Sequence, residues 1–390
     1  MQLLRVSVEP KLIRWARTRA NYSIDDLTKT FKKLPEWESG DIKPTVTQVE
    51  AFARKVHVPV GYLYCDTPPE EDIPISDFRT FSGKPATQPS PNLLTTLYDC
   101  ELRQDWYRGF ATKEGLSKSE FVGSASIKDP PINIAKEIVG RINFDRVARA
   151  SCTTWHDALR YFIRQVDEAG ILVMISGIVR GNTHRKLNPE EFTGFALADP
   201  IAPLIFVNGA DIKAIQSFTL ANELAHLWLG ESALSDSGIR MNLNSMNSSV
   251  PREEVWCNAV AAEMLVPIEH LKKQLHTNES LEDLLFRLVK LYKVSSLVVL
   301  RRMLDASYFN ETEFEKYWLV ELSKFNKTRN QASGGNFYCS TISRVGRRFA
   351  YALVSSANVG NTLSRDAFRL LGIKRADTYD QLARELKLER

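Results

Sequence analysis

The chain has 390 residues, of which 44% are apolar and 25% are charged, and this length and apolar share predict two or three packed domains. Lys and Arg number 51 against 47 Asp and Glu, which leaves a formal net charge of +4. A charge this dilute excludes assigning the chain to the nucleic-acid-binding proteins on composition alone.

Neither the start of the chain nor its hydropathy predicts a membrane protein. Residues 1–12 lack the apolar core and cleavage site of a signal peptide, and no run of about 18 apolar residues occurs. We therefore expect a soluble cytoplasmic protein with no membrane partner. The five cysteines are scattered and never form a C-x-x-C pair, so we expect reduced thiols rather than a disulfide scaffold or a zinc ribbon.

The first 65 residues predict a small all-helical domain. Apolar residues recur there at helical spacing in three segments, which are 9–20, 23–31 and 45–56. Residues 66–92 contain six prolines between more periodic segments. This composition indicates a linker or an extended crossover.

The middle of the chain, 93–305, predicts an α+β domain. The expected helices are 93–113, 132–141 and 155–168, and the expected strands are 171–175, 192–199 and 203–209. The last expected elements are a helix at 211–230, a Ser- and Asn-rich loop at 231–250 and a helix at 251–266. Helices, then antiparallel strands, then helices are typical of the α+β class. A helical C-terminal domain is expected at 306–390.

The helix expected at 211–230 contains the sequence Asn-Glu-Leu-Ala-His at 222–226. Positions 222 and 226 fall on one helix face a turn apart, which is the spacing at which the histidines of H-E-x-x-H hold one Zn²⁺. Glu223 can flank a metal-bound water and act as its general base. Alone, N-E-x-x-H is weak evidence, because a single histidine on an amphipathic helix is more often packed or solvated.

The residues around this motif resemble the ImmA/IrrE family of zincin-like metallopeptidases. The segments SFTLANELAHLWLG and EEVWCNAVAAEMLVP are similar to the family's metal helix and to the helix after it. The resemblance implies Zn²⁺ as cofactor, Glu223 as the catalytic residue, and His226 and Glu254 as metal ligands, with Glu253 as the alternative to Glu254. The matching positions of the second helix are Asn258, Ala261, Ala262, Leu265 and Pro267.

The resemblance extends to both sides of these helices. GFALADPIAPLIFVNGAD is similar to the family's strand pair, which supplies an edge for an extended peptide substrate, a general mode of recognition. We expect residues 203–208 to form that edge. Residues 337–374 are similar to the helical tail of longer family members.

Asn222 stands where the family has its first zinc histidine. A neutral amide oxygen is a poor ligand for zinc, which normally needs three protein ligands, so we expect zinc binding to be weak or lost. Three interpretations stay open: a natural pseudoenzyme, an inactivating substitution, or a site that tolerates Asn or another metal. His184, His270 and His276 lack metal spacing to His226 and are interpreted as ordinary surface residues.

Residues 1–65 resemble the helix-turn-helix domain of phage repressors, with WESG and the following Pro-Thr pair as the best matches. The stretch that should hold the recognition helix is only residues 32–36, with Pro35 inside it, whereas a groove-reading helix needs two or more turns. We therefore expect a degenerate domain with weak DNA binding. The basic residues that remain for phosphates are Arg14, Arg17, Arg19, Lys29, Lys32, Lys33 and Lys43, and a solvated basic face explains them equally well.

The resemblance implies a regulator that acts on one specific protein, either a repressor or a toxin. The first hypothesis is a zinc peptidase or its inactive relative, and the rival is a non-catalytic antitoxin or transcriptional regulator that binds a toxin, DNA or both. Asn222 favours the rival, whereas Glu223, His226 and Glu254 favour the enzyme. Neighbouring aromatic, thiol and acidic side chains are interpreted as core packing or variable positions; these are Trp228, Trp256, Cys257 and Glu263.

Overall fold

The computed structural model describes residues 4–69, 89–235, 251–275, 279–329 and 337–388. The chain divides into two compact units. Of the described residues, the first unit contains 4–69 and 89–98, and the second contains those from 99 onward. Each unit has its own apolar core. No described helix is long and apolar enough to cross a membrane.

The first unit is a bundle of short helices. They are α1 (Pro10–Arg19), α2 (Ile24–Thr28), α3 (Leu34–Ser39), α4 (Val46–Val56) and the 3-10 helix η1 (Val60–Tyr64). Capping boxes begin α2 and α4, because the side chains of Ser23 and Thr45 each accept from the backbone amide three residues ahead. In return, their own backbone amides donate to the side chains of Asp26 and Gln48. The apolar faces meet in one cluster, in which Trp37 and Phe52 pack edge to face.

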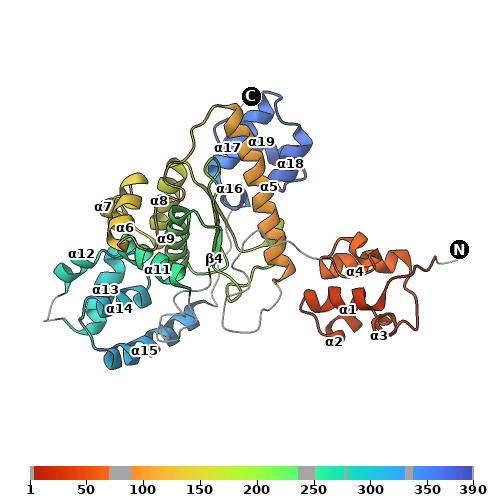
Figure 1. The fold of residues 1–390 in the computed structure, drawn as a ribbon, viewed down its shortest axis with the longest axis horizontal. Helices are drawn as coiled ribbons and strands as arrows, with labels where there is room; N and C mark the ends of the chain where they lie inside the picture. The colour runs from red at the N-terminus through yellow and green to blue at the C-terminus, as the bar shows by residue number, and fades with distance from the viewer. Residues whose placement is uncertain (1–3, 70–88, 236–250, 276–278, 330–336, 389–390) are drawn as a thin grey trace. The chain divides into compact units, whose positions relative to one another are not determined.

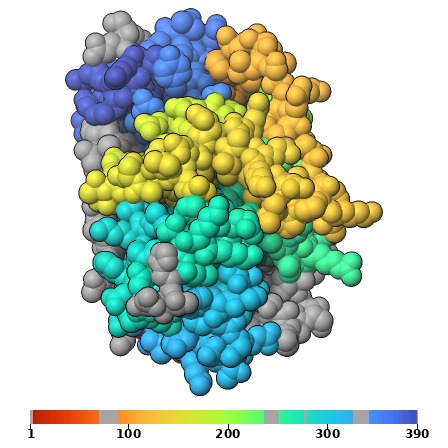
Figure 2. Space-filling model, turned by 90° about the vertical axis from the view of Figure 1, so that its left-hand side faces the viewer, coloured from red at the N-terminus to blue at the C-terminus, as the bar shows by residue number. Residues whose placement is uncertain are grey.

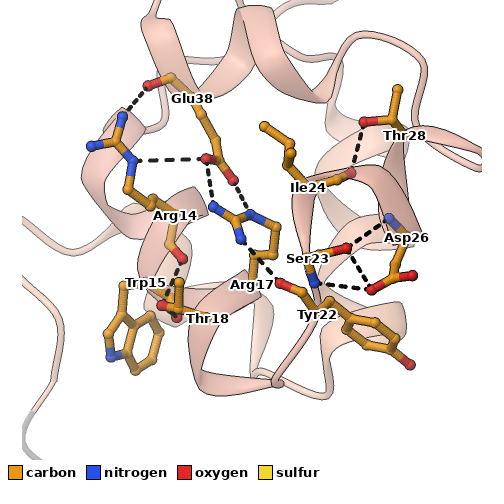
Figure 3. Close-up of polar contacts among 10 residues, drawn as sticks. All are labelled: Arg14, Trp15, Arg17, Thr18, Tyr22, Ser23, Ile24, Asp26, Thr28 and Glu38. Carbon is orange, nitrogen blue, oxygen red and sulfur yellow. Dashed lines mark hydrogen bonds and ion pairs between the residues drawn. The ribbon is translucent and has the colours of Figure 1, made fainter.

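A buried ion pair joins α1 to α3 inside this bundle (Figure 3). Arg17 Nε and Nη2 donate to the two carboxylate oxygens of Glu38 at 2.7 and 3.0 Å. Arg17 Nη1 also donates to the carbonyl of Tyr22, and Arg14 donates to the carbonyl of Glu38. The two-pronged geometry and the burial of Glu38 make this pair a specific link between the two helices.

Helix α3 only partly overlaps the stretch 32–36, in which we expected no full recognition helix. It begins at Leu34, so Pro35 lies in its first turn, where a missing amide hydrogen costs no helical bond. It then continues to Ser39 and ends at Gly40, whose φ of +87° is left-handed. Trp37 and Glu38 of this helix are buried, so they are withdrawn from any surface that a groove-reading helix would present.

The second unit is built around a four-stranded sheet. Its strands are β1 (Leu172–Ser176), β2 (Gly194–Leu197), β3 (Leu204–Asn208) and β4 (Ala233–Ser235), in the order β1-β3-β2-β4. The strands β2 and β3 form the expected antiparallel pair, with Gly194 opposite Val207 and Leu197 opposite Leu204. Figure 1 shows α8 and α9 on one side of the sheet and α5 on the other.

Three expectations about this sheet were wrong. First, β1 runs parallel to β3, so the sheet is mixed. Second, residues 203–208 are no edge, because β3 lies between β1 and β2. Third, β4 lies within the segment 231–250 that we expected to be a loop, and it pairs with β2. The strand order depends on which segments meet across the chain, and local spacing carries no information about that.

Helices surround the sheet and continue to the end of the chain. They are α5 (Pro91–Lys113), which begins in the first unit, α6 (Pro131–Arg141), α7 (Arg146–Ser151), α8 (Trp155–Glu168), the 3-10 helix η3 (Val179–Gly181), α9 (Lys213–Leu229), α11 (Arg252–Leu265), α12 (Ile268–Gln274), α13 (Leu281–Tyr292), α14 (Ser296–Asp305), α15 (Glu311–Arg329), α16 (Phe337–Val345), α17 (Arg347–Asn358), α18 (Ser364–Leu371) and α19 (Ala376–Glu385). In Figure 2 the yellow band of α6–α8 lies between the C-terminal helices above and α11–α15 below. The sheet and the helices α9 and α11 share one core.

We predict that Glu38→Ala lowers the free energy of unfolding of the first unit by about 3 kcal/mol, because it leaves the Arg17 guanidinium without its carboxylate. Hydrogen exchange of the α1–α4 amides in the full-length protein measures the change. The double variant Arg17→Met/Glu38→Leu is the control and should lose much less, because no unpaired charge remains. Equal losses in the two variants would show that the ion pair itself is not what stabilises the contact.

Candidate site on helices α9 and α11

The helix α9 crosses the centre of the second unit and is buried along most of its length. It ends at Gly230, whose φ of +74° is left-handed and whose missing side chain lets the backbone of Gly123 approach. Gly194 of β2 makes similar room beside the middle of α9. A Cβ at Gly194 would lie 2.5 Å from Thr219 Cγ2 and 3.0 Å from Glu223 Oε1.

The structure brings together three of the residues that the sequence singles out. His226 Nε2 lies 3.2 Å from Glu254 Oε2, which links α9 to α11. Asn222 lies one turn before His226, and its Nδ2 is 3.4 Å from Glu254 Oε1. All three side chains are buried. The expected convergence is therefore present, while the roles of these residues as ligands stay predictions.

Asn222 is held on both sides of its carboxamide. Its Nδ2 donates to Asn258 Oδ1 at 3.1 Å, and its Oδ1 accepts from the hydroxyl of Ser235 at 2.9 Å. Asn258 Nδ2 in turn donates to Glu254 Oε1 at 2.9 Å. We call these five residues, Asn222, His226, Ser235, Glu254 and Asn258, the α9–α11 network. It connects α9, α11 and the edge strand β4.

The carboxylate of Glu254 determines how both amides are oriented. An ionised carboxylate only accepts hydrogen bonds, so the NH₂ groups of Asn222 and Asn258 must face it. If Asn222 were turned over, its oxygen would meet Glu254 Oε1 and Asn258 Oδ1, which are both acceptors. The oxygen of Asn222 is therefore directed at Ser235 and away from Glu254.

Burial changes the protonation of the acidic groups beside this network. It raises the pKa of Glu223 to about 8, although His226 and Ser235 oppose the shift. The side chain of Glu223 is fully buried, and neither of its oxygens has a hydrogen-bond partner among the described residues. At pH 7 this carboxyl group is mostly neutral.

His226 has the opposite tendency. Burial lowers its pKa, but Cys257 and Glu254 raise it well above its usual value. Burial also raises the pKa of Cys257 to about 11, so that thiol is neutral at pH 7. We therefore attribute the raised pKa of His226 to Glu254, and the two residues form a buried ion pair.

The other residues considered from the sequence lie outside the network. Glu253 is partly buried on α11, beside Glu254 in the chain but not one of the five residues of the network, and His184 is exposed. His270 is only partly buried, and its Nδ1 contacts the hydroxyl of Tyr292 at 2.6 Å. His276 lies outside the described residues. Four further side chains pack or pair nearby: Trp228 stacks on Phe121, Trp256 donates to the carbonyl of Asp129, Cys257 is buried and Glu263 pairs with Arg302.

Comparison with known protein families identifies the domain that holds this network. Residues 166–304 match the family model Peptidase M78, described as the IrrE N-terminal-like domain. This part of the chain is an ImmA/IrrE family domain. Residues 345–385, which contain α17–α19, match a domain of unknown function, DUF8813. The comparison with curated proteins found no match.

The ImmA/IrrE family is one of zincin-like metallopeptidases, so the network can be compared with what zinc needs. Both polar atoms of Asn222 already have protein partners, and its NH₂ group faces Glu254 where a metal would need a lone pair. His226 Nδ1 is buried and has no acceptor among the residues that the structure describes, whereas a zinc-bound histidine normally donates from its second nitrogen. Within the described ranges, no three His, Cys, Asp or Glu side chains are grouped to hold a metal. The residues present therefore do not fit zinc.

Sequence reasoning missed three residues of this part of the ImmA/IrrE domain. Ser235 lies in the segment expected to be a loop, and Asn258 was used only to align the family pattern. Gly194 was not considered, although its missing side chain is what accommodates Glu223. The only local signal was the Glu-x-x-x-Asn spacing of Glu254 and Asn258, because residues four apart on a helix lie on one face.

We predict that Asn222→Leu lowers the free energy of unfolding by about 2–3 kcal/mol, because Ser235, Glu254 and Asn258 each lose a buried hydrogen-bond partner. Chemical denaturation of the full-length protein measures the loss. Asn133→Leu, on the exposed surface of α6, is the control and should change stability by less than about 0.5 kcal/mol. A loss equally small at Asn222 would mean that the network does not stabilise the fold.

Proposed function

We propose that this protein is a non-catalytic member of the ImmA/IrrE family that regulates one specific protein by binding it. The observation that supports this proposal is the closed α9–α11 network, in which the carboxamide of Asn222 bonds to Asn258, Glu254 and Ser235. A catalytic zinc site keeps ligands free for the metal and one position open for water. In this chain the side chains at the ligand positions form hydrogen bonds with one another instead.

The charges of the network support the same proposal. In a zinc site the metal supplies the positive charge beside the ligating carboxylate, and in this chain the protonated ring of His226 supplies it instead. A general base must be ionised to accept a proton, whereas burial keeps the carboxyl group of Glu223 mostly neutral at pH 7. A mostly neutral carboxyl group accepts a proton less readily than an ionised one, which supports a non-catalytic role for the domain.

One observation favours a second candidate, a regulatory peptidase that works with a different metal or a rearranged site. Glu223 is retained at the family's general-base position, and both of its oxygens lack a partner among the described residues. A purely structural residue at a fully buried position costs less stability if it is apolar. Retention of the acid is thus the feature that a non-catalytic role does not explain.

The partner that we propose is a protein, either a toxin or a repressor, and DNA is at most a weak second ligand. Of the seven basic residues that the sequence singles out in the first unit, two are withdrawn from solvent, because Arg17 pairs with Glu38 and Arg19 is buried over the ring of Trp15. The other five are exposed, and they are Arg14, Lys29, Lys32, Lys33 and Lys43. Without a long recognition helix to place them in the major groove, such side chains contact phosphates rather than base edges.

We predict that the purified protein contains no stoichiometric zinc and that Asn222→His gains it, because a second imidazole one turn from His226 completes a three-ligand set with Glu254. Metal analysis by mass spectrometry measures the gain. The variant Asn258→His, in the same network but on α11, is the matched control and should gain no zinc. Stoichiometric zinc in the unaltered protein would contradict the proposal.

We also predict that the protein binds the product of the adjacent gene without cutting it, because the unaltered network has no site for a metal. Co-purification and intact-mass analysis of the partner measure binding and cleavage together. Zinc-loaded Asn222→His serves as the comparison for cleavage. Cleavage by the unaltered protein, abolished by Glu223→Gln, would establish the second candidate in place of the first.

We further predict that duplex DNA binds weakly, without sequence preference, and is released between about 0.05 and 0.2 M salt, because the contacts are with phosphates. Fluorescence anisotropy with two unrelated duplexes measures this. Lys32→Ala/Lys33→Ala should reduce the salt slope by about 2, whereas Lys113→Ala/Lys118→Ala in the second unit should not change it. Tight, salt-resistant binding to only one duplex would show that the first unit reads sequence.

A further inference from the structure

An apolar groove lies between α13 and α15, at the end of the second unit opposite α17–α19 (Figure 1). It holds a cavity of about 690 Å³, which the first turn of α9 also lines. The apolar side chains of its two long walls recur about one turn apart on each helix, and they are Leu281, Leu285, Phe286, Val289, Tyr317 and Val320. The groove is therefore formed by two helix faces rather than by a loop.

Several apolar side chains around this groove are open to solvent. Phe286 is 71% exposed, Val320 is 54% exposed and Tyr317 is 39% exposed. Leu319, next to Val320 on α15, is 61% exposed as well. Single exposed apolar residues are common on protein surfaces, whereas a group of them around a hollow is typical of a surface that another molecule covers.

The charged side chains that line the groove balance one another. They are two lysines and two glutamates, namely Lys213, Lys324, Glu282 and Glu321. Lys324 Nζ lies 2.8 Å from Glu321 and 3.8 Å from Glu282, so much of the balance is local to α13 and α15. A surface with a net charge repels its own copy and attracts a partner of the opposite charge. This balanced surface can meet a second copy of itself without net repulsion.

The same surface combines a projecting side chain with a hollow. Phe286 lines the cavity and is also the most exposed of its apolar side chains. An apolar cavity of roughly 150 Å³ is enough to hold a benzene ring, so the larger cavity here has room for a phenylalanine ring and its neighbours. In a two-fold symmetric dimer one patch meets the same patch of the other copy. Each projecting ring then faces the hollow of the other copy.

We propose that this groove is the surface through which two copies of the chain form a symmetric dimer. Phe286 of each copy enters the groove of the other, and Tyr317 and Val320 pack around it. The helices α13 and α15 of the two copies bury one another's apolar faces, as the helices of a bundle do. This proposal does not depend on the α9–α11 network or on whether the protein cuts its partner.

Sedimentation velocity of the full-length protein over a hundredfold range of concentration tests the proposal. We expect an equilibrium between monomer and dimer. Phe286→Asp and Val320→Asp should each weaken dimerisation at least about tenfold, because an unpaired carboxylate would be buried in the centre of the interface. Val359→Asp is the matched control and should leave the equilibrium unchanged, because Val359 is 72% exposed but lies at the end of α17. Circular dichroism checks that each variant is folded.

A charge reversal tests the balance of the groove. Glu282→Lys changes the summed charge of the lining residues from zero to +2 in each copy. Dimerisation should therefore weaken at low salt and recover in part at high salt, where the repulsion is screened.

The proposal is overturned if the unaltered protein stays monomeric throughout, or if the dimer persists in both Phe286→Asp and Val320→Asp. A monomer that loses its protein partner through Phe286→Asp would also overturn it and would assign the groove to that partner.

Discussion

The carboxylate of Glu254 is the group on which the centre of the second unit depends. It is buried between α9 and α11 and can only accept hydrogen bonds, so every polar neighbour has to offer it a hydrogen. His226, Asn222 and Asn258 all do so. A buried carboxylate without such partners would be strongly destabilising, which makes these contacts a condition of the fold as well as a feature of the site.

An asparagine in place of the first zinc histidine changes the hydrogen bonds of the whole network, because Glu254 needs donors around it. In a zinc site the metal is the shared partner of the ligands, and each ligand orients its lone pairs toward it. An asparagine at position 222 instead turns its hydrogens toward Glu254 and its oxygen toward Ser235. The edge strand β4 is then joined to α9 through a side chain as well as to β2 through its backbone. A site of this kind holds elements together, which suits a protein that binds a partner without cutting it.

Local spacing in the sequence determined several features of the α9 helix and of the sheet. The one-turn separation of Asn222 and His226, the stop at Gly230 and the strand pair β2–β3 all follow from contacts within a few residues, and the structure has them. The likeness of the second helix also singled out Glu254, which the fold brings to 3.2 Å from His226.

Only the tertiary structure decided the rest. The parallel pairing of β1, the central place of β3 and the strand β4 depend on which distant segments meet, and residue periodicity is the same for an edge strand and a central one. The bond from Ser235 to Asn222 follows from that strand order, and so does the orientation of the amide. A cavity of about 690 Å³ likewise forms between α9, α13 and α15, which are separate in the sequence and become neighbours only when the core packs.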